Sequence, residues 1–451
     1  MKNLSLCSEF EQLCARGRAK RRGRIVSLIS FLFVFLGAGP LRAQSQSQSP
    51  FHLVEQLARV LVLVENHYVQ PVDRARMVEG AVKGMVAELD PHSSYLSPKE
   101  YEEFRNDTEG HFVGIGVEVD ARDGLITVIR PMEGSPAERA GLRPGDQVIA
   151  IDDWPTQAKP LDQVVRRIRG QQGTPVSLLL RRPGVAQPLR VRIVRAQVHV
   201  RSVIGKRLEG NVAYVGIKQF QRGTHQEFLQ VLGDLRLQRD EPLEGMILDL
   251  RANPGGLVHE SAQVADELLD GGIIFTTRAR GRVLDEVTAS LGGAASRLPL
   301  AVLVNELTAS AAELVAGAIQ DHGRGIIVGA KTFGKGSVQS IVELPEGAAL
   351  KLTTTLYYTP LGRTIQAEGI TPGVAVQQPG SGDGFPIVRE QDIEGHLASP
   401  NAAPRVSSPS TATTSEIMIP RHVPSNPVGR GDRALSIAYQ LLLSDLIARK
   451  K

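Results

Sequence analysis

The chain has 451 residues, of which 42% are hydrophobic and 22% charged, a globular composition. This length predicts two or three domains, because single cores rarely grow past about 250 to 300 residues. The net charge is +4, but residues 1–43 hold eight Lys and Arg and two Glu, so residues 44–451 carry about −2. The basic charge belongs to the leader, and we expect no nucleic-acid partner.

Residues 1–43 have the order of an export signal. A basic run at 20–24 precedes an apolar stretch at 25–39, and a Gln- and Ser-rich segment follows Ala43. This order predicts a signal peptide cleaved after Ala43 and a protein exported to the periplasm or outer cell envelope. The apolar stretch is shorter than the roughly 20 residues that span a bilayer, although a signal anchor retained in the inner membrane remains an alternative. A twin-arginine signal at Arg21-Arg22 is a weaker one.

Both cysteines, Cys7 and Cys14, lie upstream of the predicted cleavage. The mature chain would therefore have no disulfide framework, no thiolate metal site and no cysteine nucleophile. We expect neither a metal nor a cofactor.

Residues 51–105 are predicted to form a small helical region, in which the breaker Asp90-Pro91 follows the second apolar-periodic stretch. Such helices can pack on their own chain or on a second subunit, so a homo-oligomer through them is left open. The apolar residues that recur at helical spacing are Leu53, Leu57, Val60, Leu61 and Val64, and then Val78, Val82, Met85 and Leu89.

Residues 106–200 alternate as strands, with turn signals such as Pro144-Gly145-Asp146, and predict a compact, mainly β domain. In residues 201–376, apolar strands alternate with helical or glycine-rich stretches, the pattern of a layered α/β domain. Its predicted strands are Val212–Phe220, Met246–Leu250, Leu300–Val304 and Ile326–Gly329.

Two further segments complete the chain. Residues 377–430 are rich in Ser, Pro, Thr, Ala and Gly without periodicity and are predicted to be a disordered insert. Residues 431–451 contain a last helix, which should dock on the core through one face. That face carries Leu435, Ala438, Leu442 and Leu446.

Three loops of the α/β domain follow strands, at the sheet edge where such domains place their sites. In the first, Gly255 and Gly256 at a helix start allow main-chain N–H groups to approach an anion, although an ordinary β-to-α turn has the same pattern. In the second, Ser310 lies at a strand–turn–helix junction, with the N–H of Ala311 beside it as a candidate oxyanion donor. On this local evidence alone, a helix N-cap is the favoured role for Ser310, because serine is the commonest residue at that position.

The third loop, residues 329–339, nearly spells the phosphate-binding motif G-x-x-x-x-G-K-[ST]. The match fails at Gly336, where a hydroxyl is required, and residues 337–344 alternate like a strand, so a nucleotide hydrolase is a distant alternative. A reactive serine needs a base, and no histidine forms a recognisable set with Ser310. A lysine can serve if burial lowers its pKa, and Lys335 in its glycine-lined turn fits this role better than Lys331.

Together these stretches resemble the carboxy-terminal processing proteases, serine endopeptidases with a Ser/Lys dyad. The resemblance covers roughly residues 53–377 and the final helix. It rests on Leu89–Leu96, Gly114–Gly116, Arg251–Gly256, Ser310–Glu313, Gly334–Gln339 and Tyr357–Pro360.

The resemblance implies a crotonase-like ββα peptidase core, an inserted mainly-β PDZ domain and an N-terminal helical region. It makes Ser310 the nucleophile, Lys335 the general base and Gln339 the residue that orients the lysine. Asp321 would have a supporting, structural role. Ala311 and either Gly255 or Gly256 would supply the oxyanion hole.

By the same resemblance, Gly114, Ile115 and Gly116 would bind the carboxylate of a substrate C-terminus, beside an apolar pocket lined by Phe112, Ile115 and Val117. Arg169 resembles a regulatory arginine of the family, but a solvated surface arginine is an equal alternative. The expected partners are proteins with free apolar C-termini and an activating adaptor protein. The expected function is C-terminal processing or degradation of cell-envelope proteins, and the rival is an inactive PDZ-bearing scaffold.

Overall fold

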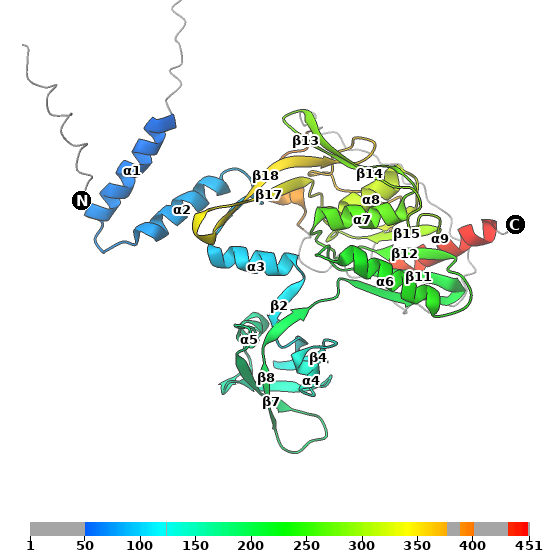
Figure 1. Ribbon diagram of the computed structural model, residues 1–451, viewed down its shortest axis with the longest axis horizontal. Coiled ribbons are helices and arrows are strands. Elements are labelled where there is room, and N and C mark those ends of the chain that lie inside the picture. Colours follow the sequence, from blue (N-terminus) through cyan, green and yellow to red (C-terminus); the bar gives the residue numbers. More distant parts are fainter. Residues whose placement is uncertain (1–49, 123, 377–387, 401–431, 450–451) are drawn as a thin grey trace, which may run out of the picture. The chain divides into compact units, whose positions relative to one another are not determined.

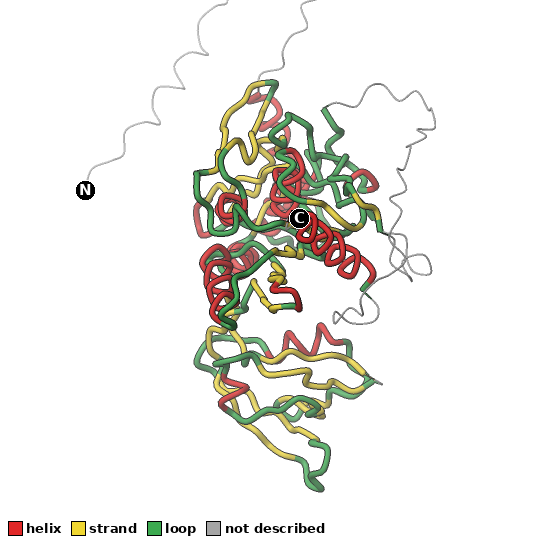
Figure 2. The backbone as a smooth tube through the Cα atoms, turned by 90° about the vertical axis from the view of Figure 1, so that its right-hand side faces the viewer, coloured by secondary structure: helices red, strands yellow, loops and turns green. Residues whose placement is uncertain are grey.

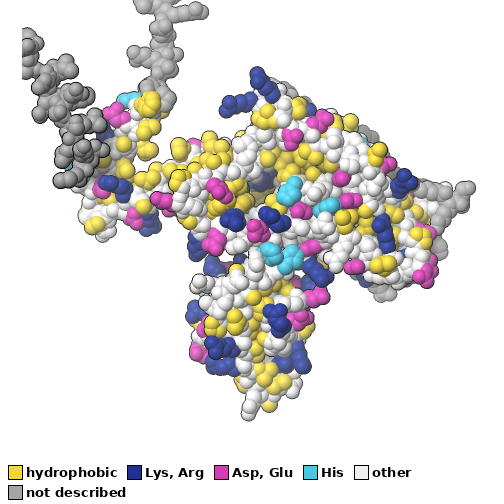
Figure 3. Space-filling model, viewed as in Figure 1, with side chains coloured by type: hydrophobic (Ala, Val, Ile, Leu, Met, Phe, Trp, Pro, Cys, Tyr) yellow, Lys and Arg dark blue, Asp and Glu magenta, His cyan; other side chains and the backbone are white. Residues whose placement is uncertain are grey.

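The computed structural model describes residues 50–122, 124–376, 388–400 and 432–449, arranged in two units that divide after Arg74 (Figure 1). The first unit contains α1 (Pro50–His67). Its apolar side chains are exposed and gather over the helix in Figure 3, including Leu53 at 56% and Leu57 at 58% exposure. No helix in the described ranges is long and apolar enough to cross a membrane. The predicted leader lies outside these ranges.

The second unit begins at Ala75, within α2 (Arg74–Ala87), and continues with β1 (Ser94–Leu96) and α3 (Pro98–Thr108). The end of α2 confirms the predicted break before Asp90-Pro91. The buried carboxylate of Asp90 accepts hydrogen bonds from the N–H groups of His92 and Ser93 at 2.8 and 2.9 Å, which closes the turn before β1.

A strand-rich region follows, with apolar residues buried at every second position, as in the exposure pattern of β7. Figure 2 shows this region with short helical segments among its strands. Two strands pair antiparallel where it joins the rest of the unit, β2 (His111–Gly114) and β9 (Ala196–His199). Its sheet has the order β3 (Val117–Arg122), β4 (Leu125–Pro131), β5 (Gln147–Ile151), β7 (Pro175–Arg181) and β8 (Leu189–Val194). It also contains β6 (Trp154–Pro155), α4 (Pro136–Arg139) and α5 (Leu161–Ile168).

The α/β region is built on a six-stranded sheet in which all neighbours from β11 onward are parallel. Parallel strands covered on both faces read as uninterrupted apolar runs, and all residues of β12 and β15 are buried. The order is β10 (Val203–Arg207), β11 (Val212–Ile217), β12 (Gly245–Asp249), β15 (Leu300–Val304), β16 (Ile326–Gly329) and β19 (Val374–Ala375).

Alternate residues of these strands face two different helical layers. Met246 and Leu248 share a hydrophobic cluster with α6 (Thr224–Leu237), α7 (Val258–Leu268) and α8 (Ala311–Asp321). Ile247 packs on the opposite face with α9 (Arg433–Arg449) (Figure 1). The predicted docking face of the last helix is confirmed, because Leu435, Ala438, Leu442 and Leu446 are all buried there.

A second sheet has the order β1, β18 (Ala349–Tyr358), β13 (Gly272–Ala279) and β14 (Arg282–Ala289), with β17 (Ser337–Glu343) also paired to β18. The β13–β14 hairpin is missing from the sequence prediction. Three short 3₁₀ helices, η1 (Glu209–Asn211), η2 (Pro345–Gly347) and η3 (Glu390–Asp392), complete the described elements.

The predicted disordered insert is wrong for residues 388–400. Glu390 is fully buried there, accepts a hydrogen bond from Gln366 at 2.8 Å and pairs with His92 at 2.8 Å. These contacts fix the segment, because a buried carboxylate is retained only with partners. The remaining residues of the predicted insert lie outside the described ranges.

Candidate active site

Ser310 lies between β15 and α8 in a conformation that serine rarely adopts. Its φ of 55° and ψ of −120° lie outside the extended region of an ordinary N-cap residue. Positive φ at a residue other than glycine stores backbone strain and is concentrated at functional sites. The strand–turn–helix context is that of a nucleophile presented at a sharp turn. The conformation favours this role over the capping alternative.

Lys335 lies in the loop between β16 and β17. Burial and, to a smaller extent, the neighbouring positive charge of Lys351 lower its pKa to about 8, against the opposing charges of Glu390 and Asp90. A lysine with a pKa near 8 has a substantial neutral fraction in mildly alkaline solution, as a general base requires.

A single buried carboxylate, that of Glu313, connects the serine loop to the lysine loop. Its Oε2 accepts hydrogen bonds from the main-chain N–H of Ser310 at 2.8 Å and of Lys335 at 2.9 Å. Its Oε1 accepts the N–H of Gly334 at 2.8 Å and the hydroxyl of Thr332. Burial raises the pKa of Glu313 to about 7 even though these hydrogen bonds favour the ionised form. These hydrogen bonds fix the position of the serine loop relative to the lysine loop.

Sequence reasoning missed Glu313. The available signal was the spacing Ser-x-x-Glu at a helix start, which is that of a capping box. In the structure the carboxylate performs the reciprocal half of that motif toward Ser310, and it also extends to a second loop that no local pattern reveals.

The glycine loop after β12 lies directly against Ser310. A Cβ added to Gly255, whose φ is 99°, would stand 2.8 Å from the Ser310 Cβ and 3.0 Å from the Ala311 nitrogen, so no side chain is tolerated. The Gly255 N–H donates to the Asn253 side chain at 2.8 Å. The N–H groups of Gly256 and Ala311 have no acceptor within the described part of the chain. Gly256 therefore fits the donor role better than Gly255.

Asn253 and the helix ends complete this arrangement. The carbonyl of Asn253 accepts the N–H of Ala309 at 2.9 Å, and its amide donates to the carbonyl of Ile217 at 2.9 Å. The first turns of α7 and α8 begin at Leu257 and Ser310, so both helices direct their positive ends toward this region. Such an environment stabilises negative charge that develops on a substrate oxygen.

Gln339 and Asp321 occupy different positions around this centre. The Gln339 amide, on β17, donates to the hydroxyls of Ser337 at 3.0 Å and Thr353 at 3.2 Å. Asp321 ends α8 and accepts the N–H of Leu361 at 2.9 Å and the guanidinium of Arg363. These contacts tie α8 to the turn after β18, in agreement with a structural role for Asp321.

The predicted carboxylate-binding loop follows β2. Gly116 has a φ of 72°, and a Cβ at this position would meet Ser135 at 2.3 Å, which explains the glycine. The guanidinium of Arg169 lies 5.3 Å from the centroid of the Phe112 ring. Ile115 is fully buried in the core of the domain. The prediction that it lines an open pocket is therefore revised, and Phe112 and Val117 remain as the accessible apolar residues.

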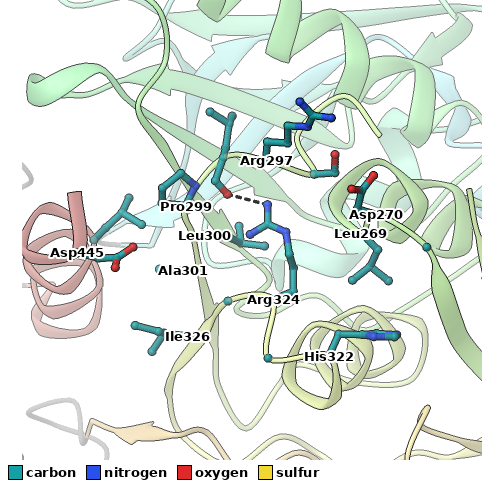
Figure 4. Close-up of a pocket in the computed structure, with 16 residues that line it drawn as sticks. Leu269, Asp270, Arg297, Pro299, Leu300, Ala301, His322, Arg324, Ile326 and Asp445 are labelled. Carbon is teal, nitrogen blue, oxygen red and sulfur yellow. Dashed lines mark hydrogen bonds between the residues drawn. The ribbon is translucent and has the colours of Figure 1, made fainter. Parts of the chain in front are cut away.

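A pocket of about 580 Å³ lies at the amino-terminal ends of strands in the six-stranded sheet, beside the first residues of β15 and β16 (Figure 4). Ser310 follows the other end of β15. Its most prominent polar group, the Arg324 guanidinium, already donates to the carbonyls of Leu268, Ala295 and Leu298 at 2.6 to 2.7 Å. This arginine therefore connects the end of α7 to the segment before β15, and none of these hydrogen bonds involves Ser310.

Comparisons with known proteins identify the family and the domains of this chain. Residues 211–376 match the model of peptidase family S41, residues 127–182 match a PDZ domain, and residues 39–100 match the activating protease CtpB N-terminal domain. The chain is 37% identical over 425 residues to a carboxy-terminal-processing protease of Bartonella bacilliformis, which covers 92% of this chain and 94% of that protein.

Further matches are of the same kind. The carboxy-terminal processing protease CtpB of Bacillus subtilis is 34% identical over 351 residues, 76% of this chain and 71% of the relative. A solved photosystem II D1 C-terminal processing protease aligns with a TM-score of 0.46 at 30% identity, covering 73% of this chain and 87% of that one. The chain belongs to the carboxy-terminal processing proteases of peptidase family S41, and it is a serine-type peptidase with an S41 fold and a PDZ domain.

Proposed function

We propose that this peptidase cleaves with a Ser310/Lys335 dyad, in which the neutral amine of Lys335 removes the proton of the Ser310 hydroxyl as it attacks the substrate carbonyl. The single observation that carries the proposal is the shared Oε2 of Glu313, which accepts from the main chains of both residues. The low pKa of about 8 at Lys335 supports the base role. The N–H groups of Ala311 and Gly256 would bind the oxyanion, and Gln339 would orient the lysine.

The decisive experiment measures cleavage of an unstructured protein by purified wild type, Ser310→Ala and Lys335→Arg. Both variants should be inactive while keeping the wild-type unfolding temperature, because arginine does not deprotonate. Lys331→Arg, in the same loop, is the matched control and should remain active. Activity of a few per cent or more in clean Ser310→Ala protein would end the assignment, and a folded, inactive wild type would favour the scaffold alternative.

The proposed biological role is C-terminal processing or degradation of cell-envelope proteins after export. Support comes from the order of charges and apolar residues in positions 1–43 and from the match of a PDZ domain, a module that captures free C-termini. Fractionation and mass determination of the mature chain test this. An N-terminus near Gln44 in the periplasm or envelope is expected, whereas an intact Met1 or Arg24 there would favour a retained anchor.

We also propose that the N-terminal region takes part in assembly, either with a second copy of the chain or with an activating adaptor. The exposed apolar residues of α1 support the first, and the name of the matched N-terminal model supports the second. Light scattering of wild type and Leu57→Asp tests the first case. A mass that is the same and monomeric for both proteins would exclude self-assembly through α1.

A further inference from the structure

A chain of hydrogen bonds runs from the N-terminal region to Gln339. The Gln339 Nε2 donates to the Thr353 hydroxyl at 3.2 Å, and that hydroxyl donates to Asp90 Oδ1 at 3.1 Å. Asp90 precedes β1, Thr353 lies on β18 and Gln339 on β17, so three separate segments meet here. β1 pairs with β18 through Ser94 and Lys351, which fixes their spacing.

The donors and acceptors in this series of hydrogen bonds follow from the ionisation of Asp90. Burial raises the pKa of Asp90, but hydrogen bonds from Ser93, His92 and Thr353 outweigh burial and hold the pKa below its ordinary value. An ionised carboxylate only accepts, so the Thr353 hydroxyl must give its proton to Asp90. The lone pairs of the Thr353 oxygen are then available to a donor. The Gln339 amide must meet them with its NH₂ group.

The other neighbour of the amide is compatible with this orientation, because a hydroxyl can accept a hydrogen bond as well as donate one. The Ser337 hydroxyl also accepts from Gln339 Nε2, at 3.0 Å. With both amide protons directed at hydroxyl oxygens, Oε1 is the part of the side chain left to accept a hydrogen bond from a nearby amine. Lys335 precedes Ser337 by two residues in the same segment, and the charge of Asp90 acts on it. An amide has two nearly isosteric orientations, and only this partner set distinguishes them.

We propose that Asp90 and Thr353 are positioning residues, which turn the Gln339 carbonyl toward Lys335 and thereby hold the lysine amine in line with Ser310. The inference rests on the proposed dyad. Its consequence is a physical connection between the region that matches the CtpB N-terminal domain, which includes Asp90, and the general base. A displacement of the turn at Asp90 would release the amide to rotate.

The test compares Thr353→Val, which removes the hydroxyl at nearly constant volume, with Thr353→Ser, which keeps it. Thr354→Val is the matched control, because Thr354 is the exposed neighbour on the same strand and its hydroxyl bonds only to the Ser340 hydroxyl among described residues. We expect kcat of Thr353→Val to fall about ten- to a hundredfold with KM within about twofold, since misplacement of a catalytic group acts on turnover. Thr353→Ser and Thr354→Val should stay close to wild type.

The pH profile separates positioning from a general loosening of the site. Loss of a carbonyl that accepts from the ammonium form lowers the pKa of Lys335, so the rising limb of the rate should move to lower pH in Thr353→Val. A site that merely opens to water would move the limb up, toward the ordinary lysine value. In addition, Thr353→Val should cost nothing further in a Gln339→Ala background, because both changes remove the same interaction.

The possible outcomes are distinct. If Gln339→Ala and Lys335→Arg remain active, the proposed dyad fails. If Gln339→Ala is slow but Thr353→Val is fast, or if the two changes add fully, the dyad stands and this inference is overturned. Should Thr353→Val not fold, Thr353→Ala gives the same decision, since it also removes the hydroxyl that links Gln339 to Asp90. Wild-type kcat and pH profile in a folded Thr353→Ala protein would refute the proposal.

Discussion

The guanidinium of Arg251 donates to the carboxylate of Asp432 at 2.8 Å, across 181 residues of sequence. Arg251 begins the glycine loop next to Ser310, and Asp432 immediately precedes α9. Arg251 also binds Asp249, whose carboxylate accepts the Tyr214 hydroxyl at 2.9 Å. The last helix is therefore bonded to the loop that we assign to the oxyanion.

Asp432→Asn should weaken this bond, with a loss of about 1 to 3 kcal/mol in the free energy of unfolding and a reduced kcat. Hydrogen bonds from Arg251 and the Leu435 N–H outweigh burial and hold the pKa of Asp432 below its ordinary value. The stabilisation is thus present at neutral pH and disappears as the pH falls through that lowered pKa. Urea unfolding of both proteins across the acidic range, with exposed Ser444→Ala as control, measures it. Equal stability at neutral pH would contradict the assignment.

Ser310→Gly should be more stable than Ser310→Ala by about 1 kcal/mol, because glycine adopts the positive φ of this position without strain. Both variants should be inactive. Thermal unfolding of the pair gives the difference. The control is Ala311→Gly, one residue further into α8, which should instead lose up to about 1 kcal/mol; a Ser310→Gly protein that is less stable than Ser310→Ala would mean that the backbone is relaxed.

The cleavage rate should rise with pH about a midpoint near 8, as Lys335 loses its proton. The positive charge of Lys351 lowers the pKa of Lys335, so Lys351→Gln should move the midpoint to higher pH. Initial rates from pH 6 to 10 on one peptide test both statements. A midpoint unaffected by Lys351→Gln would show that the two amines do not interact.

Glu313→Gln should reduce kcat at least about tenfold, because an amide accepts through one oxygen only and the two loops lose their common partner. The pKa of Glu313 is raised to about 7, so the neutral acid is the form that the fold favours. Its contribution to stability is present below the ordinary glutamate pKa and is lost as the pH rises through 7. The variant should therefore lack this part of the pH dependence of unfolding.

Glu306→Gln is the control for Glu313→Gln, since Glu306 precedes Ser310 in the same loop. It should keep the wild-type rate and the wild-type pH dependence of unfolding. A Glu313→Gln enzyme with full turnover would show that the Glu313 carboxylate is not needed to hold the proposed dyad.

A peptide with a free apolar C-terminus should bind the PDZ domain more tightly than its C-terminally amidated twin, by about 1.5 to 3 kcal/mol, because amidation removes the charge that the N–H groups accept. A C-terminal Asp or Lys should also weaken binding, since a charge would enter an apolar site. Titration of the full chain carrying Ser310→Ala, with the matched peptides, gives the ratio. Equal binding of free and amidated peptides would make the domain a spacer.

The sequence predicts the parallel sheet well because buried strands such as β12 and β15 are uninterrupted apolar runs between turn signals. It does not predict the β13–β14 hairpin, since β14 is mostly exposed and carries charged residues that resemble a loop. Among the site residues, Ser310 and Lys335 can be identified from the sequence, because each lies in a local motif. Glu313, Thr353 and Asp90 do not, because their roles depend on contacts between segments that are distant in sequence.

The position of α9 also bears on when the enzyme becomes complete. Its residues pack on one face of the six-stranded sheet, and Asp432 reaches the glycine loop only when that helix is in place. A chain whose residues 432–449 have not yet been synthesised lacks both. The structure thus makes the geometry of the glycine loop depend on the docking of α9, because the hydrogen bond from Arg251 to Asp432 forms only then.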